Sequence, residues 1–291
     1  MIRKLFRGAA IFLCGLLGLA VLLLAIAYGR LEWQKQQVYR VPVAPLQIPG
    51  DSAILARGAH LAAIKGCAEC HGEDGGGKIM LDDPALGLLV GSNLTRGRGG
   101  LPAAYTTTDW VRALKHGLRQ DGRPLLLMPS QETSQLSAED MAALIAYYNA
   151  LPAVDREQPP MAIGPVLRLL SLAGQVPLFP AQQIDHERPL LASVAVQVGP
   201  AYGEYLAISC SGCHGTSMKG MDAPAPGLPA RPDISRSGKP GRWTQEQFIE
   251  TLRTGQTPDG RQLKQEDMPW QMTARYTDEE LQSLYLYLMS I

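Results

Sequence analysis

Two copies of one short motif constrain this chain of 291 residues more than any other feature. They are Cys67-Ala68-Glu69-Cys70-His71 and Cys210-Ser211-Gly212-Cys213-His214. Two thiols three positions apart share one helical turn, and a histidine directly follows the second thiol. The C-x-x-C-H spacing is typical of c-type haem attachment, although one isolated copy would also fit a redox dithiol or half a zinc site. Only Cys14 lies outside the motifs, so no further thiols can complete a zinc site, and two covalently bound haem c groups are predicted.

This prediction gives each motif residue a role. The two cysteines of a motif add to the vinyl groups of the haem, and the histidine ligates the iron through neutral imidazole. The predicted attachment residues and proximal ligands are Cys67, Cys70, His71, Cys210, Cys213 and His214.

An internal repeat extends beyond the motifs and suggests the second axial ligand. Asp121-Gly122-Arg123 matches Asp259-Gly260-Arg261, and Met128-Pro129 matches Met268-Pro269. A lone methionine usually fills a gap in a core. Among the ten methionines, however, only Met128 and Met268 occupy equivalent places, so we predict them as the sixth ligands. A histidine could replace either one, and the remaining histidines are His60, His116 and His186.

The N-terminus predicts a membrane anchor at residues 1–29. The run from Ala9 to Tyr28 is uncharged and long enough to span a bilayer as a helix. Positive charges precede it at Arg3, Lys4 and Arg7, so we expect the rest of the chain on the outer, periplasmic side of a bacterial inner membrane. A cleaved signal peptide is the alternative, because residues 25–27 resemble an A-x-A cleavage site.

The rest of the chain predicts an all-α architecture with two small domains. Residues 30–52 are expected to form a stalk, residues 53–153 domain 1 and residues 199–291 domain 2. The last helix of each domain should begin at a cap, Ser137 or Thr277, with Asp140 or Glu280 at the capping-box position. Prolines interrupt the apolar residues 154–198, which predict a linker packed across the domains or a docking surface for a membrane partner.

These motifs resemble tandem class I cytochrome c domains, as in the membrane-anchored cytochrome subunits of periplasmic alcohol, aldehyde and gluconate dehydrogenases. The resemblance rests on C-x-x-C-H, on Asn93-Leu94-Thr95, on D-G-R, and on M-P before the last helix of each domain. It implies that Asn93 hydrogen-bonds a haem propionate. Trp243 and its counterpart Tyr105 are expected to do the same, with an ordinary core role as the alternative.

The function expected from these features is electron relay. The chain has 27 basic and 27 acidic residues. It therefore lacks the excess of positive charge that is typical of proteins that bind nucleic acid. Iron ligated by His and Met has no place for substrate and passes single electrons. The expected donors are a quinol-oxidising complex or a dehydrogenase, and the expected acceptors a soluble cytochrome or terminal oxidase. A dihaem cytochrome c peroxidase is the enzymatic alternative, and it requires one open iron.

Overall fold

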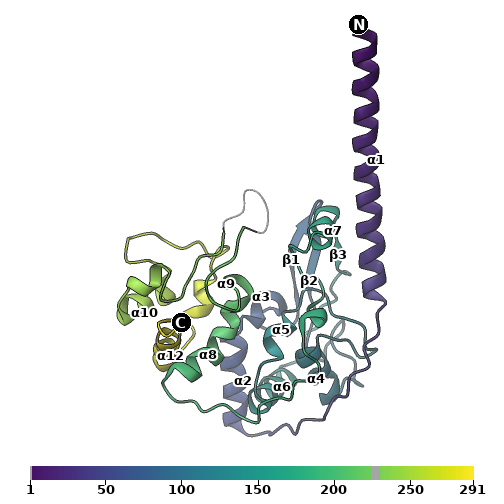
Figure 1. Ribbon diagram of the computed structural model, residues 1–291. Coiled ribbons are helices and arrows are strands. Elements are labelled where there is room, and N and C mark those ends of the chain that lie inside the picture. Colours follow the sequence, from purple (N-terminus) through teal and green to yellow (C-terminus); the bar gives the residue numbers. More distant parts are fainter. Residues whose placement is uncertain (1, 224–229) are drawn as a thin grey trace.

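The computed structural model describes residues 2–223 and 230–291. One long helix, α1 (Ile2–Lys35), extends away from a body that contains all the other elements (Figure 1). The body is mostly helical, which confirms the predicted fold class. The helices of domain 1 are α2 (Ser52–Ile64), α3 (Cys67–His71), α4 (Thr107–His116), α5 (Ser130–Thr133) and α6 (Ala138–Ala150). Those of domain 2 are α8 (Pro200–Ala207), η2 (Ile208–Cys210), α9 (Ser211–His214), η3 (Lys239–Arg242), α10 (Gln245–Thr254), α11 (Trp270–Thr273) and α12 (Asp278–Leu288).

A close helix crossing organises each domain. In domain 1, α2 packs on α6 at Gly58, where an added Cβ would lie 2.0 Å from the carbonyl oxygen of Ala143. In domain 2, α8 packs on α12 at Gly203, and the matching distance to the carbonyl oxygen of Ser283 is 1.9 Å. Only glycine lets the two backbones approach this closely. Because α2 and α8 lead directly into the C-x-x-C-H motifs, these crossings position the motifs.

The predicted caps of the last helices are present. The Ser137 hydroxyl accepts the backbone N–H of Asp140 at 3.1 Å, and Thr277 forms a complete capping box with Glu280. Asp140 does not complete the box expected for α6, because its carboxylate pairs with the Arg57 guanidinium at 2.8 and 2.9 Å. Its side chain therefore serves a contact between helices rather than a cap.

A small three-stranded antiparallel sheet corrects the expectation of a purely helical body. It consists of β1 (Lys78–Asp83), β2 (Gly87–Gly91) and β3 (Ala162–Ile163), in the order β1-β2-β3. The third strand comes from the predicted linker, which also contains α7 (Pro165–Leu172) and η1 (Pro180–Gln183). Pairing of β3 with β2 attaches the first part of the linker to domain 1.

The segment predicted as a stalk lies along domain 1 instead of standing free. Helix α1 continues to Lys35, past position 29, and the following residues are extended. Val43, Leu46 and Ile48 pack against the main hydrophobic core. This segment is therefore a strap that crosses domain 1 before α2 begins.

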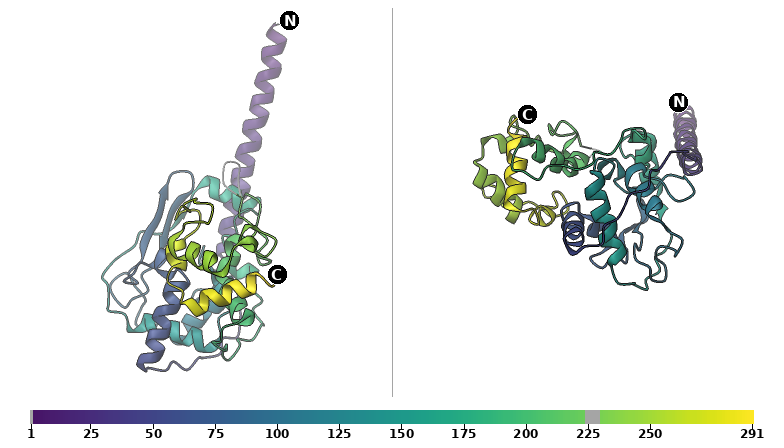
Figure 2. Two further views of the ribbon diagram at one scale, coloured as in Figure 1. Left: turned by 90° about the vertical axis from the view of Figure 1, so that its left-hand side faces the viewer. Right: turned by 90° about the horizontal axis from the view of Figure 1, so that it is seen from below.

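The two domains share one continuous hydrophobic core. Buried Leu61 and Leu144 of domain 1 belong to the same cluster as Leu206 and Leu281 of domain 2. Two further views show domain 2 on the side of domain 1 that faces away from α1 (Figure 2). The domains consequently pack directly on each other.

Candidate haem-binding sites

The two motif histidines have the same hydrogen bond. His71 at the end of α3 places Nδ1 2.8 Å from the carbonyl oxygen of Ser92, and His214 places Nδ1 2.8 Å from the carbonyl oxygen of Pro232. A carbonyl only accepts, so each Nδ1 carries the proton and each Nε2 keeps a free lone pair. Burial lowers the pKa of both imidazoles, although the carbonyl contact opposes this effect. Neutral histidine oriented in this way is prepared to ligate a metal through Nε2.

The carbonyl acceptors Ser92 and Pro232 were not predicted. The internal repeat could have indicated these two residues, because Ser92 and Pro232 are the first residues of two matching tetrapeptides, 92–95 and 232–235. The second residue of each tetrapeptide accepts the backbone N–H of the fourth, at 2.9 Å for Asn93 and at 2.8 Å for Asp233. These local turns present the carbonyls to the histidines.

The motif cysteines are free thiols, and burial affects three of them. Burial raises the pKa of Cys67 and of Cys210 to about 11, and it also raises the pKa of Cys70. All the cysteines are free of disulfide bonds. Within residues 2–223 and 230–291, no three His, Cys, Asp or Glu side chains gather as a metal site. Free thiols beside an oriented histidine fit haem c.

The two Met-Pro segments have the same backbone geometry. Pro129 precedes α5 with φ −75° and ψ 56°, and Pro269 precedes α11 with φ −75° and ψ 67°. The carbonyl of Met128 accepts the N–H of Ser130 at 2.7 Å, and the carbonyl of Met268 accepts that of Trp270 at the same distance. Both methionines are half-buried. Their equivalence in the sequence therefore extends to three dimensions, while their contact with a metal stays a prediction.

Among the three residues predicted to contact propionates, Asn93 and Tyr105 have protein partners for their side chains, and Trp243 is bonded through its backbone carbonyl. Asn93 is buried, and its amide donates to the carbonyls of Val154 and Arg156 at 2.7 and 3.3 Å. The Tyr105 hydroxyl donates to the carbonyl of Asp109 at 3.2 Å, and the carbonyl of Trp243 accepts the Tyr285 hydroxyl at 3.1 Å. Asn93 thus uses both amide hydrogens to hold the chain that follows α6, and a propionate contact at any of the three stays a prediction.

The alternative histidine ligands form contacts elsewhere. His60 lies 2.8 and 2.9 Å from the two carboxylate oxygens of Glu280 in domain 2. His116 is buried, and its Nδ1 lies 3.0 Å from Nδ1 of His186 in the linker. These pairings leave the methionines as the ligand candidates that the two domains share.

Comparison with known proteins identifies both domains. Residues 53–147 match the family described as cytochrome c oxidase, cbb3-type, subunit III, and residues 201–291 match the family described as cytochrome c. The chain therefore contains two tandem cytochrome c domains, which are haem-binding electron-transport modules.

The chain is also similar to cytochrome subunits of dehydrogenases. The cytochrome c subunit of alcohol dehydrogenase (quinone) from Gluconacetobacter polyoxogenes is 24% identical over 83% of this chain and 56% of its own length. The fructose dehydrogenase cytochrome subunit from Gluconobacter japonicus is 24% identical over 86% of this chain and 55% of its own length. The gluconate 2-dehydrogenase cytochrome c subunit from Pantoea cypripedii is 31% identical over 34% of this chain and 23% of its own length. The chain is homologous to cytochrome c subunits of dehydrogenases and spans about half the length of the first two.

Proposed function

We propose that this chain is a membrane-anchored dihaem cytochrome c that relays single electrons and does not itself transform a substrate. The observation that carries the proposal is the matched pair of sites. Each has a C-x-x-C-H motif, an imidazole with Nε2 free, and a Met-Pro segment of the same geometry. Homology to cytochrome subunits supports it.

Each domain would hold one haem with four residues. Cys67 and Cys70 would form the two thioether bonds in domain 1, with His71 and Met128 as axial ligands. In domain 2 the corresponding residues are Cys210, Cys213, His214 and Met268. Haem c held by His and Met supplies an iron that changes oxidation state by one electron. The hydrogen bond from each Nδ1–H to a backbone carbonyl fixes the ring orientation and raises the basicity of Nε2.

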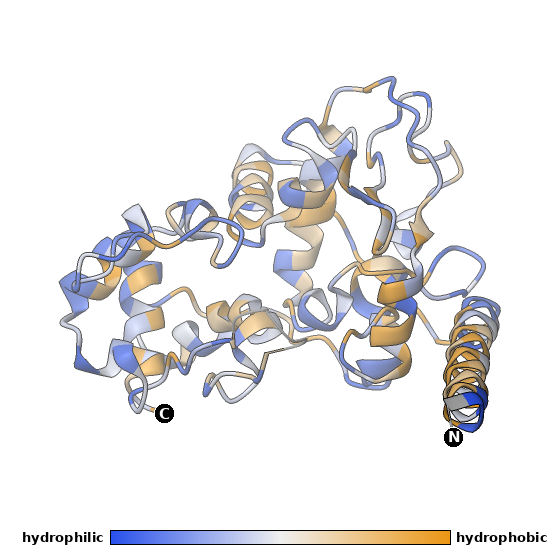
Figure 3. Ribbon diagram, turned by 90° about the horizontal axis from the view of Figure 1, so that it is seen from above, coloured by the Kyte–Doolittle hydropathy of each residue, from blue (hydrophilic) through white to orange (hydrophobic). Residues whose placement is uncertain are grey.

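The first helix would place the chain in the bacterial inner membrane. From Arg3 to Lys35 it is long and apolar enough to cross a bilayer, and no part of its apolar window is buried in the protein. Figure 3 shows apolar residues over most of this helix and hydrophilic residues at its N-terminal end, while the body carries mixed polarity. Basic residues before the apolar run favour haem domains in the periplasm.

A dehydrogenase or a quinol-oxidising complex would be the electron donor, and a soluble cytochrome or terminal oxidase the acceptor. The dehydrogenase partner is supported by relatives that are named as subunits of alcohol, fructose and gluconate dehydrogenases. The peroxidase alternative requires one iron without a methionine ligand, and the equivalence of the two Met-Pro segments favours the carrier.

A redox titration of the membrane fraction, followed by optical spectroscopy, tests this proposal. Two low-spin haems, each with the weak far-red band of Met-ligated ferric iron, would support the relay. One high-spin haem without that band would contradict it. Hydrogen peroxide turnover would then be measured to test the peroxidase alternative.

A further inference from the structure

The residues next to the two motifs meet across the domain interface. The ammonium group of Lys65, just before the first motif, donates to the hydroxyl of Ser209, just before the second, at 3.0 Å. The Tyr276 hydroxyl of domain 2 donates to the carbonyl of Ile64 at the end of α2, at 3.2 Å. An added Cβ on Gly66 would lie 2.8 Å from the sulfur of Met272. The interface therefore brings together the residues that immediately precede the two C-x-x-C-H motifs.

Two buried carboxylates hold this interface in a reciprocal way. Asp140 of domain 1 accepts a hydrogen bond from the Tyr205 hydroxyl of domain 2 at 2.8 Å. Glu280 of domain 2 accepts a bond from His60 of domain 1. Asp140 and Glu280 occupy equivalent positions in α6 and α12, three residues after the caps Ser137 and Thr277. We call these four side chains, His60, Asp140, Tyr205 and Glu280, the interdomain network.

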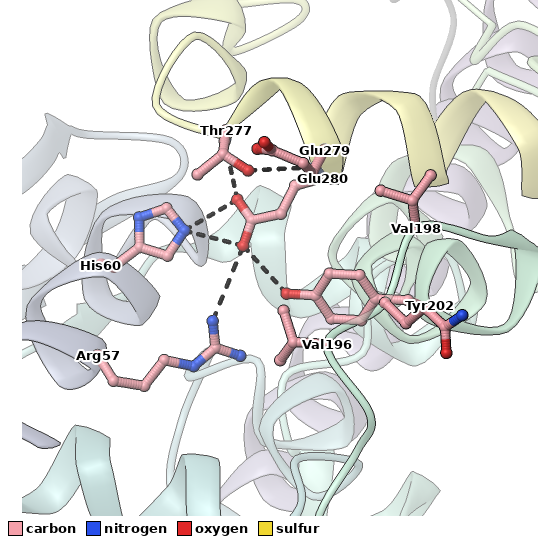
Figure 4. Close-up of a pocket in the computed structure, with 9 residues that line it drawn as sticks. Arg57, His60, Val196, Val198, Tyr202, Thr277, Glu279 and Glu280 are labelled. Atoms are coloured by element: carbon pink, nitrogen blue, oxygen red, sulfur yellow. Dashed lines mark hydrogen bonds and ion pairs between the residues drawn. The ribbon is translucent and has the colours of Figure 1, made fainter. Parts of the chain in front are cut away.

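Each carboxylate also has a partner inside its own domain. The Arg57 guanidinium binds both oxygens of Asp140, and the Tyr202 hydroxyl donates to Glu280 at 3.1 Å. Arg57 also reaches across the interface, where its guanidinium lies 3.8 Å from the Glu280 carboxylate. Figure 4 shows His60, Arg57 and Tyr202 converging on the carboxylate of Glu280. Glu280 is 3% exposed and Asp140 is 5% exposed. A buried carboxylate held by several donors has little freedom to move, so the network defines one orientation of the domains.

From this geometry we infer that the interdomain network is a positioning device for electron transfer between the two haems of the same chain. The inference rests on the proposed relay function. The network lies on α2, α6, α8 and α12, and α2 and α8 lead directly into the motifs. Loss of its bonds lets the domains shift, which changes the separation between the haem attachment segments without changing either haem site. His60 and Tyr205 are positioning residues, because they act through the domain interface and not on a haem.

The test measures how fast an electron redistributes between the haems after flash photoreduction of the oxidised full chain in detergent. The main variant combines His60→Leu with Tyr205→Phe, which removes the two hydrogen bonds that the network makes between the domains and leaves the contact of Arg57 with Glu280 in place. We expect redistribution to become multiphasic, with a slower component from molecules whose domains have shifted. Loss of one hydrogen bond to a charged group should raise the fraction of such molecules about tenfold. The optical spectrum and the potential of each haem should not change.

Two variants separate positioning from general packing. Thr251→Val removes a buried hydroxyl that donates to the carbonyl of Gln247 at 2.8 Å within domain 2, and it should leave the redistribution rate as in the unmodified chain. The single variants His60→Leu and His60→Gln are compared next, and His60→Gln, which keeps an N–H donor for Glu280, should redistribute electrons faster than His60→Leu. If the double variant does not assemble its haems, Tyr205→Phe alone provides the comparison with Thr251→Val.

Unchanged redistribution in the double variant, with both haems intact, would overturn the inference. An equal slowing by Thr251→Val and Tyr205→Phe would overturn it as well, because the effect would not depend on the domain interface. Failure of the proposed function gives a different result. In that case the unmodified chain would lack two reducible low-spin haems, or would show no redistribution step.

Discussion

At the scale of single residues, the proposed sites depend on two methionines that the sequence repeat selects and that the structure places in equivalent loops. Leu127, just before Met128, has φ +60°, a left-handed conformation that non-glycine residues rarely adopt. Pro129 follows with a fixed φ and no N–H donor. Met128 thus lies between two residues that restrict the backbone, which is suited to holding a sulfur ligand at one position.

Replacement of either methionine should affect one haem only. In Met128→Ala the first haem would lose its sulfur ligand, and its reduction potential should fall because methionine ligation raises the potential. Optical redox titration should show that half of the far-red methionine band is lost, and Met268→Ala should remove the other half. Met289→Leu, a near-isosteric change at the end of α12, is the control and should leave both haems as they are. Unaltered spectra and potentials in Met128→Ala would show that the ligand assignment in domain 1 is wrong.

Glu280 should make stability depend on pH in the acidic range. Burial raises the pKa of its carboxyl group, but hydrogen bonds from His60, the backbone N–H of Thr277 and Tyr202 outweigh burial and hold the pKa below 4.5. A carboxyl whose pKa is lower in the folded state stabilises the fold above its unfolded pKa, and this contribution is lost as pH falls through the folded pKa. The free energy of unfolding should therefore fall as the pH drops below 4.5. In Glu280→Gln this dependence should be weaker, and equal slopes in denaturant titrations of both proteins would refute the assignment.

At the scale of helices and strands, the sequence is informative about helices because their signals are local. Ser137 and Thr277 were predicted as caps from neighbouring residues, and each accepts the backbone N–H of the residue three positions later. The sheet was missed because its strands lack such signals. β1 carries Lys78 and two aspartates, and β3 has only two residues that pair with a strand far earlier in the chain.

As with the helices, the residues of the candidate sites that could be predicted are those with a local sequence signal. The cysteines, histidines and methionines stand in short motifs whose spacing encodes their chemistry. His60 and Glu280, in contrast, are 220 positions apart, so no local pattern connects them. Asp140 appeared to be part of a capping box because the sequence could not show that Arg57 and Tyr205 compete for its carboxylate.

The helix crossings should tolerate no side chain at their glycines. In Gly58→Ala the new methyl group would collide with the backbone of α6, and we expect a loss of about 1–3 kcal/mol in the free energy of unfolding, as for other overpacked cores. Alanine is intrinsically the better helix former, so a loss shows that the collision dominates. Gly50→Ala, where no atom lies within 4 Å, is the control. Denaturant unfolding of both variants decides the question, and a stabilised Gly58→Ala protein would contradict the crossing geometry.

At the scale of the whole molecule, retention of α1 can be tested by its response to charge. Leu17→Arg places a charge in the middle of the apolar run and should cost about 2.5–3.5 kcal/mol in membrane insertion. The variant should appear in the soluble fraction after an alkaline wash, while the unmodified chain stays in the membrane pellet. Leu5→Arg, beside Lys4, is the control and should remain in the pellet. A mature protein that begins after residue 27 would show instead that the segment is a cleaved signal peptide.

The C-terminal part of α1 packs against the body. Leu31 is buried with Leu167 of α7, and the Arg168 guanidinium lies 3.9 Å from the ring centroid of Tyr28 and 3.2 Å from the carboxylate of Glu32. With α1 in a bilayer, the body cannot swing on a flexible tether, and both haem domains are carried at a fixed height above the lipid. A membrane-bound partner then finds this protein by lateral diffusion in two dimensions, and only a partner whose redox centre lies at the matching height can exchange electrons with it.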